Sequence, residues 1–347
     1  MQPYKILSTK TEKPINMIKL SQNENAFGTP PLALKAIAEQ GQEVFRYPDA
    51  NHEDLIEKLA DKHNVKPDNI IVSAGSVALL DMSIMSFVSS GENVVTAEVT
   101  WVGYKIIAKI KKKECRLAKL VDNAISLENV LSLCDDKTKL VLLANPNNPT
   151  STMISHDELK EFMRQIPPDV YVVSDEAYAE YITEDDYPDT MELQKTYPNL
   201  LIFHTFSKIY GLAGLRIGYA ITHPDVIKSL MPYKMPFSIP NLAAAAASAA
   251  LDDTEYVEKC AAINAEERDF LYTELSGMGF DITVPHGNFV FIDLSSAEER
   301  ARVDNHLRNV GISVRALEPF GSETALRITV GQPEENRYLV KCLKAVK

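Results

Sequence analysis

Short apolar runs alternate with helical stretches through the middle of the chain. Six such runs, rich in valine, isoleucine and leucine, occupy residues 69–73, 93–97, 139–144, 170–173, 200–203 and 218–221. Segments with a helical spacing of apolar side chains, such as 78–88 and 157–165, separate several of them. Strands that are apolar at nearly every position and alternate with helices are typical of a largely parallel sheet covered on both faces. The pattern therefore predicts an α/β fold.

The later part of the chain has a different order of elements. An alanine-rich helix is expected from Pro240 to residue 251, and a long helix over 254–275. Strands are then expected at 288–293, 312–315 and 325–330, with helices at 297–310 and from about 333. This mixture predicts a smaller α+β domain. We expect an N-terminal arm with part of the small domain at 1–45, a large ligand-binding domain at 46–252, and a small C-terminal domain at 253–347.

Unusual polar clusters follow five of the predicted strands. They are Gly75-Ser76, Trp101, Asn148, Asp175 to Tyr178, and Thr205 to Lys208, while a sixth cluster, Arg46-Tyr47, follows no strand. In open parallel sheets, ligands bind outside the carboxyl ends of the strands. The five clusters are therefore expected to converge on one site.

The last cluster contains a lysine whose surroundings suggest covalent chemistry. Lys208 lies between Ser207 and an apolar, glycine-rich segment, and Arg216 follows eight residues later. A desolvated lysine loses its proton more easily, and its free amine can form a Schiff base with a carbonyl. An arginine offers a charged fork that suits a phosphate. A carbonyl and a phosphate together suggest pyridoxal phosphate; the alternative is a buried turn with one exposed lysine.

The cluster after residues 170–173 would complement such a cofactor. Asp175 is expected to be partly buried, and a buried carboxylate needs a cation, which a protonated pyridine nitrogen would provide. The alternative is an aspartate that caps a helix. Tyr178 could reach the phenolic oxygen of the cofactor, or pack in the core with a satisfied hydroxyl.

The remaining clusters are weaker signals when taken singly. Asn148, in a turn between prolines, could donate to the same phenolic oxygen. Gly75, Ser76 and Val77 open a helix whose backbone N–H groups could hold a phosphate. Trp101, the only tryptophan, could stack on a ring or be buried in the core.

Composition and charge narrow the classes of protein. Lysine plus arginine number 36 against 48 acidic residues, a formal net charge of −12, which argues against a nucleic-acid or anionic-membrane binder. The four cysteines are scattered, so neither a metal site nor a disulfide framework is expected. No apolar run is long enough to span a bilayer, and a cytoplasmic protein is expected. The glycines at 211, 214 and 218 do not match the dinucleotide-binding motif, which disfavours a nicotinamide dehydrogenase.

Taken together, the motifs resemble those of a known family. They are Asn23-Glu-Asn25, Arg46-Tyr-Pro-Asp49, Ala144-Asn-Pro-Asn-Asn-Pro-Thr150, Ser174-Asp-Glu-Ala-Tyr178, Thr205-Phe-Ser-Lys208, Gly211-Leu-Ala-Gly-Leu-Arg216 and Leu326-Arg-Ile-Thr-Val-Gly331. In this order, they resemble the class I/II (fold type I) pyridoxal-phosphate aminotransferases, most closely the histidinol-phosphate aminotransferase group. The resemblance implies a mostly parallel seven-stranded sheet with helices on both faces, plus the smaller α+β domain.

The resemblance also implies a role for each matching residue. Lys208 would bind the cofactor covalently and then move the proton, Asp175 would pair with the pyridine nitrogen, and Asn148 and Tyr178 with the phenolic oxygen. Trp101 would stack on the ring. The phosphate would be held by Gly75, Ser76, Val77, Thr205, Ser207 and Arg216, and by Tyr47 of a neighbouring subunit. Arg327 would clamp the α-carboxylate of the substrate, and Arg315 would assist with the rest of it. Asn25 and Phe27 would also bind the substrate.

The resemblance further implies a homodimer with shared active sites. Its substrates would be a small amino donor, either an amino acid or an amino alcohol phosphate (histidinol phosphate-like or aromatic), and a 2-oxo acid acceptor such as 2-oxoglutarate. The sequence departs from the family pattern at Phe27, Val77, Trp101 and Ser151. Phe27, Val77 and Ser151 keep open a pyridoxal-phosphate lyase, decarboxylase or cyclase acting on a specialised amino acid. A regulator that retains the fold without turnover is a third possibility.

Overall fold

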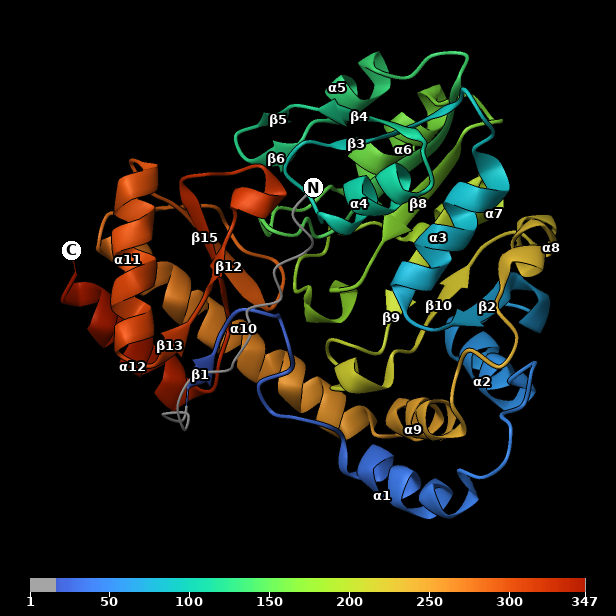
Figure 1. The fold of residues 1–347 in the computed structure, drawn as a ribbon, viewed down its shortest axis with the longest axis horizontal. Coiled ribbons are helices and arrows are strands. Elements are labelled where there is room, and N and C mark those ends of the chain that lie inside the picture. The colour runs from blue at the N-terminus through green and yellow to red at the C-terminus, as the bar shows by residue number, and fades with distance from the viewer. Residues whose placement is uncertain (1–16, 347) are drawn as a thin grey trace.

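The computed structural model describes residues 17–346 and contains one large sheet and one smaller sheet (Figure 1). The large sheet has seven strands in the order β2-β10-β9-β8-β7-β3-β4. Their bounds are β2 Ile70–Ser73, β10 Gly218–Ile221, β9 Leu200–Thr205, β8 Tyr171–Asp175, β7 Thr138–Ala144, β3 Asn93–Ala97 and β4 Glu114–Ala118. Only β10 runs antiparallel to its neighbours. The prediction of a mostly parallel seven-stranded sheet is confirmed.

One of these strands had no counterpart in the apolar pattern of the sequence. β4 reads Glu-Cys-Arg-Leu-Ala and, among its five residues, only Ala118 is fully buried. It lies at the edge of the sheet and pairs with β3 alone, so most of its side chains face solvent and need not be apolar.

Helices cover both faces of the large sheet, as predicted. The helices α3 (Ser76–Phe87), α4 (Gly103–Ile110) and α8 (Pro224–Leu230) pack on one face. The other face is covered by α1 (Pro31–Gln40), α2 (Glu53–His63), α5 (Leu127–Ser132), α6 (His156–Gln165), α7 (Thr190–Thr196) and α9 (Asn241–Asp252). Alternate residues of β9 point to opposite faces, with Ile202 in one core cluster and Phe203 in the other.

The smaller sheet has four antiparallel strands in the order β11-β12-β15-β14. They are β11 Asp281–Ile282, β12 Phe289–Asp293, β15 Ala325–Thr329 and β14 Arg315–Ala316. Helices α11 (Ala297–Asn309) and α12 (Pro333–Lys344) pack with this sheet, and α10 (Thr254–Gly277) runs from beside α9 to it (Figure 1). Separately, β1 (Ile18–Lys19) pairs in parallel with β13 (Ile312–Ser313). β5 (Leu120–Val121) pairs antiparallel with β6 (Ala124–Ile125).

The predicted smaller domain is therefore present, and β1 joins it to the start of the described chain. Residues 1–16 of the predicted N-terminal segment 1–45 lie outside the described residues, and the exact domain boundaries stay a prediction. Among the described helices, none combines the length and the apolar character needed to cross a membrane.

Candidate active site

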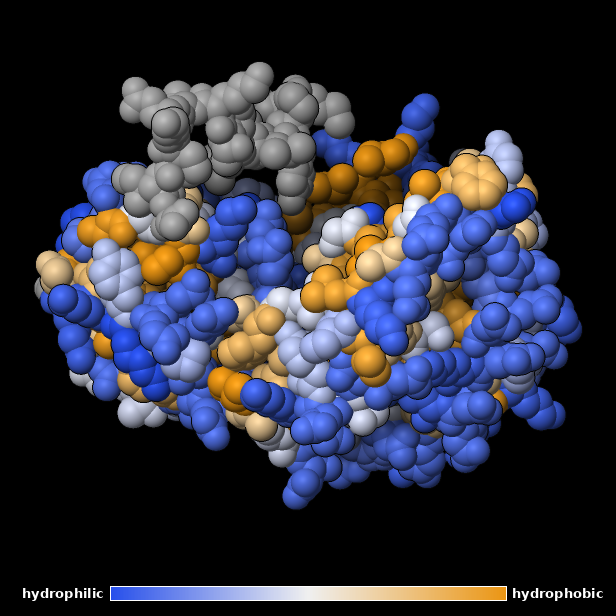
Figure 2. Space-filling view, turned by 90° about the horizontal axis from the view of Figure 1, so that it is seen from below, coloured by the Kyte–Doolittle hydropathy of each residue, from blue (hydrophilic) through white to orange (hydrophobic). Residues whose placement is uncertain are grey.

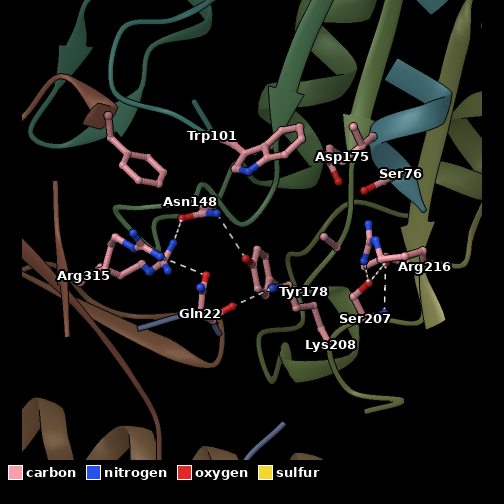
Figure 3. Close-up of a pocket in the computed structure, with 16 residues that line it drawn as sticks. Gln22, Ser76, Trp101, Asn148, Asp175, Tyr178, Ser207, Lys208, Arg216 and Arg315 are labelled. Carbon is pink, nitrogen blue, oxygen red and sulfur yellow. Dashed lines mark hydrogen bonds between the residues drawn. The ribbon is translucent and has the colours of Figure 1, made fainter. Parts of the chain in front are cut away.

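A cavity of about 190 Å³ lies where the carboxyl ends of the large-sheet strands face the small sheet (Figure 3). Twelve residues predicted from the sequence line it: Ser76, Val77, Trp101, Asn148, Asp175, Tyr178, Thr205, Ser207, Lys208, Arg216, Arg315 and Arg327. Four others line it without having been predicted: Gln22, Ala144, Ala177 and Phe320. The five polar clusters that follow strands are thus brought together, because parallel neighbours end at the same edge of the sheet.

One end of the cavity is built to hold an anion. Arg216 donates from Nη1 to the Ser207 hydroxyl at 3.2 Å, and the Thr205 hydroxyl donates to the same oxygen at 3.0 Å. α3 begins at Ser76, so its N-terminal N–H groups and helix dipole also favour negative charge there. Gly75 does not line the cavity, but a Cβ at this position would lie 2.5 Å from Arg216 Nη2. With φ of +82°, Gly75 therefore makes room for the guanidinium group beside the helix.

A buried carboxylate lies near this anion site. Asp175 ends β8 and is 7% exposed; its Oδ2 accepts a hydrogen bond from the Tyr104 hydroxyl at 2.7 Å. Its Oδ1 is buried and has no hydrogen-bond partner among the described residues. Burial raises the pKa of Asp175 to about 6, although Tyr104, the Ala177 N–H and Lys208 all act to lower it. The next helical turn begins at Ala179 without a side-chain cap, so the helix-cap interpretation of Asp175 is wrong.

The raised pKa of Asp175 predicts a pH-dependent stability of the protein without bound ligand. The pKa of Asp175 is about 6 in the folded state and near 4 in the unfolded state. The protonated carboxyl therefore stabilises the fold fully below pH 4, and this stabilisation is lost as the pH rises through about 6. Asp175→Asn should therefore raise the free energy of unfolding at pH 7 by about 2–3 kcal/mol. Urea unfolding at pH 4 and pH 7 measures this. An Asp175→Asn variant with the same gain at both pH values would contradict the prediction.

Lys208 and Tyr178 lie in the middle of the cavity. The Lys208 amine donates to the Gln22 carbonyl at 3.1 Å and lies 5.4 Å from the centre of the Tyr178 ring. The Tyr178 hydroxyl accepts hydrogen bonds from Asn148 Nδ2 at 3.3 Å and Asn23 Nδ2 at 3.0 Å. Because Lys208 is half-buried and lines the cavity, it is not an exposed lysine on a buried turn.

Two arginines from the small sheet form the other end of the cavity. Arg315 on β14 and Arg327 on β15 are direct cross-strand partners. Arg327 donates to Asn148 Oδ1 at 2.5 Å and to the Ser21 carbonyl at 2.7 Å, and Arg315 donates to Gln22 Oε1 at 3.0 Å. In Figure 3, Arg216 and Arg315 lie at opposite ends, with Tyr178 and Lys208 between them. The cavity can therefore receive two anionic groups, one at each end.

Trp101 forms one wall of the cavity. Its indole meets the Tyr104 ring edge to face, with centroids 5.2 Å apart, and lies over Gly103, where a Cβ would collide with it. The residue is only half-buried and lines the cavity, so a flat ligand can stack on its ring.

Three further predicted residues lie outside the cavity. Tyr47 is 84% exposed, with its ring 5.3 Å from that of Phe237. Asn25 donates to the Ile209 carbonyl at 2.7 Å and accepts from the Phe27 N–H, so it supports the backbone next to Lys208. Phe27 packs against the large core. Neither Asn25 nor Phe27 lines the cavity, so no contact supports the prediction that they bind the substrate.

Sequence reasoning missed several residues that shape the site. Tyr104 lies one helical turn after Trp101, and this spacing could have drawn attention to it. Asn23 belongs to the Asn23-Glu-Asn25 motif and holds Tyr178 from the N-terminal segment. Gln22 and Phe320 carried no signal, because only the packing of distant segments brings them to the cavity.

Ser151 stands where the family pattern expects glycine, and its backbone φ is +62°. A side chain is strained in this left-handed region, but the buried Ser151 hydroxyl accepts hydrogen bonds from the N–H groups of His286 at 3.1 Å and Gly287 at 3.0 Å. These bonds tie the Asn148 loop to the chain that leads into β12. Ser151 therefore has a structural role, and its presence does not indicate a different reaction.

We expect Ser151→Ala to lower the free energy of unfolding by about 2 kcal/mol, because it removes the acceptor and keeps the strained conformation. Ser151→Gly removes the same acceptor but relieves the strain, so its cost should be about 1 kcal/mol smaller. Denaturant unfolding of both variants measures the difference. Equal costs would show that the backbone at residue 151 is not strained.

The residues present fit pyridoxal phosphate. The anion site at Arg216 matches the phosphate, and the unpartnered Asp175 Oδ1 matches a protonated ring nitrogen. Asn148 and Tyr178 offer polar groups between the two, and Lys208 places its amine in the same cavity. Each group of the cofactor thus has a chemically complementary partner among the lining residues.

Comparison with known proteins agrees with this fit. Residues 15–343 match the family model of aminotransferase class I and II. Histidinol-phosphate aminotransferases of Moorella thermoacetica and of an Anaeromyxobacter species are 35% and 38% identical to this chain, over 95% of the chain in each case and over 86% and 90% of those proteins. The crystal structure of histidinol-phosphate aminotransferase from Sinorhizobium meliloti in complex with pyridoxal-5'-phosphate matches with a TM-score of 0.89 and 28% identity, covering 95% of this chain and 90% of that one. The family predicted from the sequence is confirmed: this chain belongs to the class I and II aminotransferases, which depend on pyridoxal phosphate.

Proposed function

We propose that this aminotransferase takes its amino group from an amino alcohol phosphate of the histidinol phosphate type and passes it to a 2-oxo acid such as 2-oxoglutarate. The observation that carries the proposal is the pairing of Arg315 and Arg327 across β14 and β15, at the end of the cavity away from Arg216. Two adjacent guanidinium groups suit a phosphate dianion or a carboxylate. The similar proteins named above are also histidinol-phosphate aminotransferases.

Several residues of this chain would hold the cofactor and orient it in the cavity. Arg216, Ser207, Thr205 and the N-terminus of α3 would hold the phosphate of the cofactor and so fix its position. Asp175 would keep the ring nitrogen protonated, and Trp101 would keep the ring in place. When bound there, pyridoxal phosphate would supply an electron sink for the negative charge that develops at the substrate Cα.

Lys208 would transfer the proton. Its amine lies between the anion site and the two arginines of the small sheet, so a substrate held by Arg327 would present its Cα near this base. The hydrogen bond from Lys208 to the Gln22 carbonyl directs the amine towards the small sheet. A positioned base of this kind contributes roughly 10²–10⁴-fold to the rate.

A panel of amino donors tests the proposed substrate class. The cofactor-loaded protein is mixed with histidinol phosphate, with histidinol and with phenylalanine, and conversion of the cofactor to its amine form is followed by its visible absorbance. We expect the highest kcat/KM for histidinol phosphate, and a loss of about 100-fold or more when the phosphate is missing. Equal rates for histidinol and histidinol phosphate would contradict the phosphate specificity, and a preference for phenylalanine would favour an aromatic amino acid donor.

The same assay without a 2-oxo acid addresses the alternative reactions. A lyase, decarboxylase or cyclase would turn over repeatedly without an acceptor, whereas an aminotransferase stops after one half-reaction. Two of the three departures that suggested such chemistry, Phe27 and Ser151, lie outside the cavity lining. We therefore favour transamination over these alternatives and over a regulator without turnover.

We also propose a homodimer with shared active sites. Tyr47 is highly exposed, and it lies among other exposed apolar side chains: Val44, Phe45, Met235 and Phe237 are between 50% and 72% exposed. On the face seen from below, Figure 2 shows hydrophobic side chains exposed among hydrophilic ones. A second copy that covers Tyr47 and the four other exposed apolar side chains would remove them from water. Sedimentation should then give twice the mass of one chain, and Phe45→Glu should shift the protein towards a monomer with weaker cofactor binding.

A cytoplasmic location also stays a proposal, which cell fractionation would test.

A further inference from the structure

Tyr104 is the residue that contacts Asp175 most directly, and no role follows for it from the functions described above. It is 1% exposed, and its hydroxyl donates to Asp175 Oδ2 at 2.7 Å. This hydrogen bond leaves Oδ1 as the only carboxylate oxygen of Asp175 without a partner among the described residues. The two oxygens of this carboxylate therefore differ: Oδ2 is held by Tyr104, whereas Oδ1 is buried without a hydrogen-bond partner in a residue that lines the cavity.

The turn that carries Tyr104 also carries Trp101. α4 begins at Gly103, and Trp101 comes three residues before Tyr104, so the two aromatic rings meet edge to face with centroids 5.2 Å apart and an interplanar angle of 87°. The Tyr104 ring is packed in the core between α4 and the large sheet. A ring held in this way has little freedom, so its hydroxyl keeps a fixed position relative to Asp175.

We propose that Tyr104 is a positioning residue, which fixes the Asp175 carboxylate so that Oδ1 is the oxygen presented to the ring nitrogen of the cofactor. The inference rests on the pyridoxal phosphate site proposed above. Tyr104 touches neither substrate nor cofactor in this arrangement, because its hydroxyl is occupied by Asp175 and it does not line the cavity. Its effect is transmitted entirely through the carboxylate.

The charges around Asp175 agree with this role. The hydrogen bond from Tyr104 favours the ionised carboxylate and lowers its pKa, in opposition to burial. The backbone N–H of Ala177 and the charge of Lys208 act in the same direction. The titratable side chains that interact with Asp175 are Tyr104, Lys208, Glu176 and Tyr187. Without the Tyr104 hydroxyl, the pKa of Asp175 should rise further, and a smaller fraction would carry the charge that a protonated ring nitrogen requires.

Cofactor binding gives a readout that does not depend on turnover. Trp101 is the only tryptophan and lines the cavity, so the quenching of its fluorescence reports the binding of pyridoxal phosphate to the cofactor-free protein. We expect Tyr104→Phe to raise the dissociation constant about tenfold at pH 7. Tyr210→Phe is the matched control: it also removes one hydroxyl from a fully buried tyrosine, and that hydroxyl has no hydrogen-bond partner among the described residues.

The pH dependence of binding separates positioning from a purely structural effect. Binding weakens as the pH falls through the pKa of Asp175, because the protonated carboxyl no longer attracts the ring nitrogen. In Tyr104→Phe this weakening should begin at a higher pH than in the unmodified protein. Tyr104→Phe should also have little further effect on the dissociation constant in an Asp175→Asn background, since its action runs through the carboxylate.

The outcomes distinguish this inference from the proposed function. Unchanged affinity and an unchanged pH midpoint in Tyr104→Phe would overturn the role of Tyr104, while the unmodified protein still binds the cofactor and transaminates. An equal loss from Tyr104→Phe with and without the Asp175→Asn substitution would overturn it as well. If the unmodified protein itself fails to bind pyridoxal phosphate, both the inference and the proposed function are contradicted.

Discussion

Replacement of Lys208 by alanine is expected to lower turnover by about 10⁴-fold, the largest effect of any single substitution in the cavity. The amine would be the group that binds the cofactor and then moves the proton, and a positioned base contributes up to about this factor. Lys208→Arg should be similarly inactive, although it keeps a positive charge, because guanidinium does not lose its proton in proteins. Steady-state turnover and the visible absorbance of the lysine-bound cofactor measure both effects.

A control lysine and a rescue experiment make this prediction sharper. Lys109 lies at the exposed end of α4 and does not line the cavity. Lys109→Ala should therefore retain activity. An added small amine should restore part of the lost turnover in Lys208→Ala, but not in Lys208→Arg, where the longer side chain fills the space. Retention of substantial activity by Lys208→Ala would exclude it as the proton-transferring base.

Arg327→Lys is expected to lower kcat/KM for the phosphorylated donor by about 100-fold, which corresponds to about 2.7 kcal/mol. Lysine keeps the charge but loses the planar fork that can donate two parallel hydrogen bonds. Arg327 is 4% exposed and also donates to Asn148 Oδ1, so its guanidinium connects the substrate end of the cavity to the loop that carries Asn148. The loss should lie mainly in KM, because the interaction is made in the ground state as well as in the transition state.

Arg308→Lys on α11 is the matched control for Arg327→Lys. Arg308 pairs with Asp304 away from the cavity, so the same change there should leave kcat/KM unaltered. Comparison of donors with and without a phosphate adds specificity: Arg327→Lys should affect the phosphorylated donor more strongly. If both donors lose the same factor, Arg327 acts on the cofactor site and not on the substrate phosphate.

The central sheet could be predicted because its strands are buried on both faces. The side chains of β7, β8 and β9 are buried at almost every position, and each strand contains a run of apolar residues that can be recognised in the sequence. The edge strand β4 left no such record, because most of its side chains meet solvent. A central strand that is buried on both faces is therefore easier to predict from the sequence than an edge strand.

The site shows a similar division. Asp175, Thr205 and Lys208 were predictable, since each lies at the end of a recognisable strand or just after it, and parallel strands deliver their carboxyl ends to one edge. Gln22 and Phe320 were not, because they reach the cavity only after the small sheet packs on the large one. The Tyr104 hydrogen bond to Asp175 needs side-chain positions that no spacing rule supplies.

The pairing of β1 with β13 sets an order of events during protein synthesis. Ile18 is among the first described residues to leave the ribosome, but its strand partner Ile312 follows almost three hundred residues later. All seven strands of the large sheet lie before residue 222, so that sheet can form while β1 still has no strand partner. Gln22 contacts both Lys208 and Arg315. The nascent chain can thus build the cofactor end of its cavity early, but the substrate end is completed only when the last part of the message has been translated.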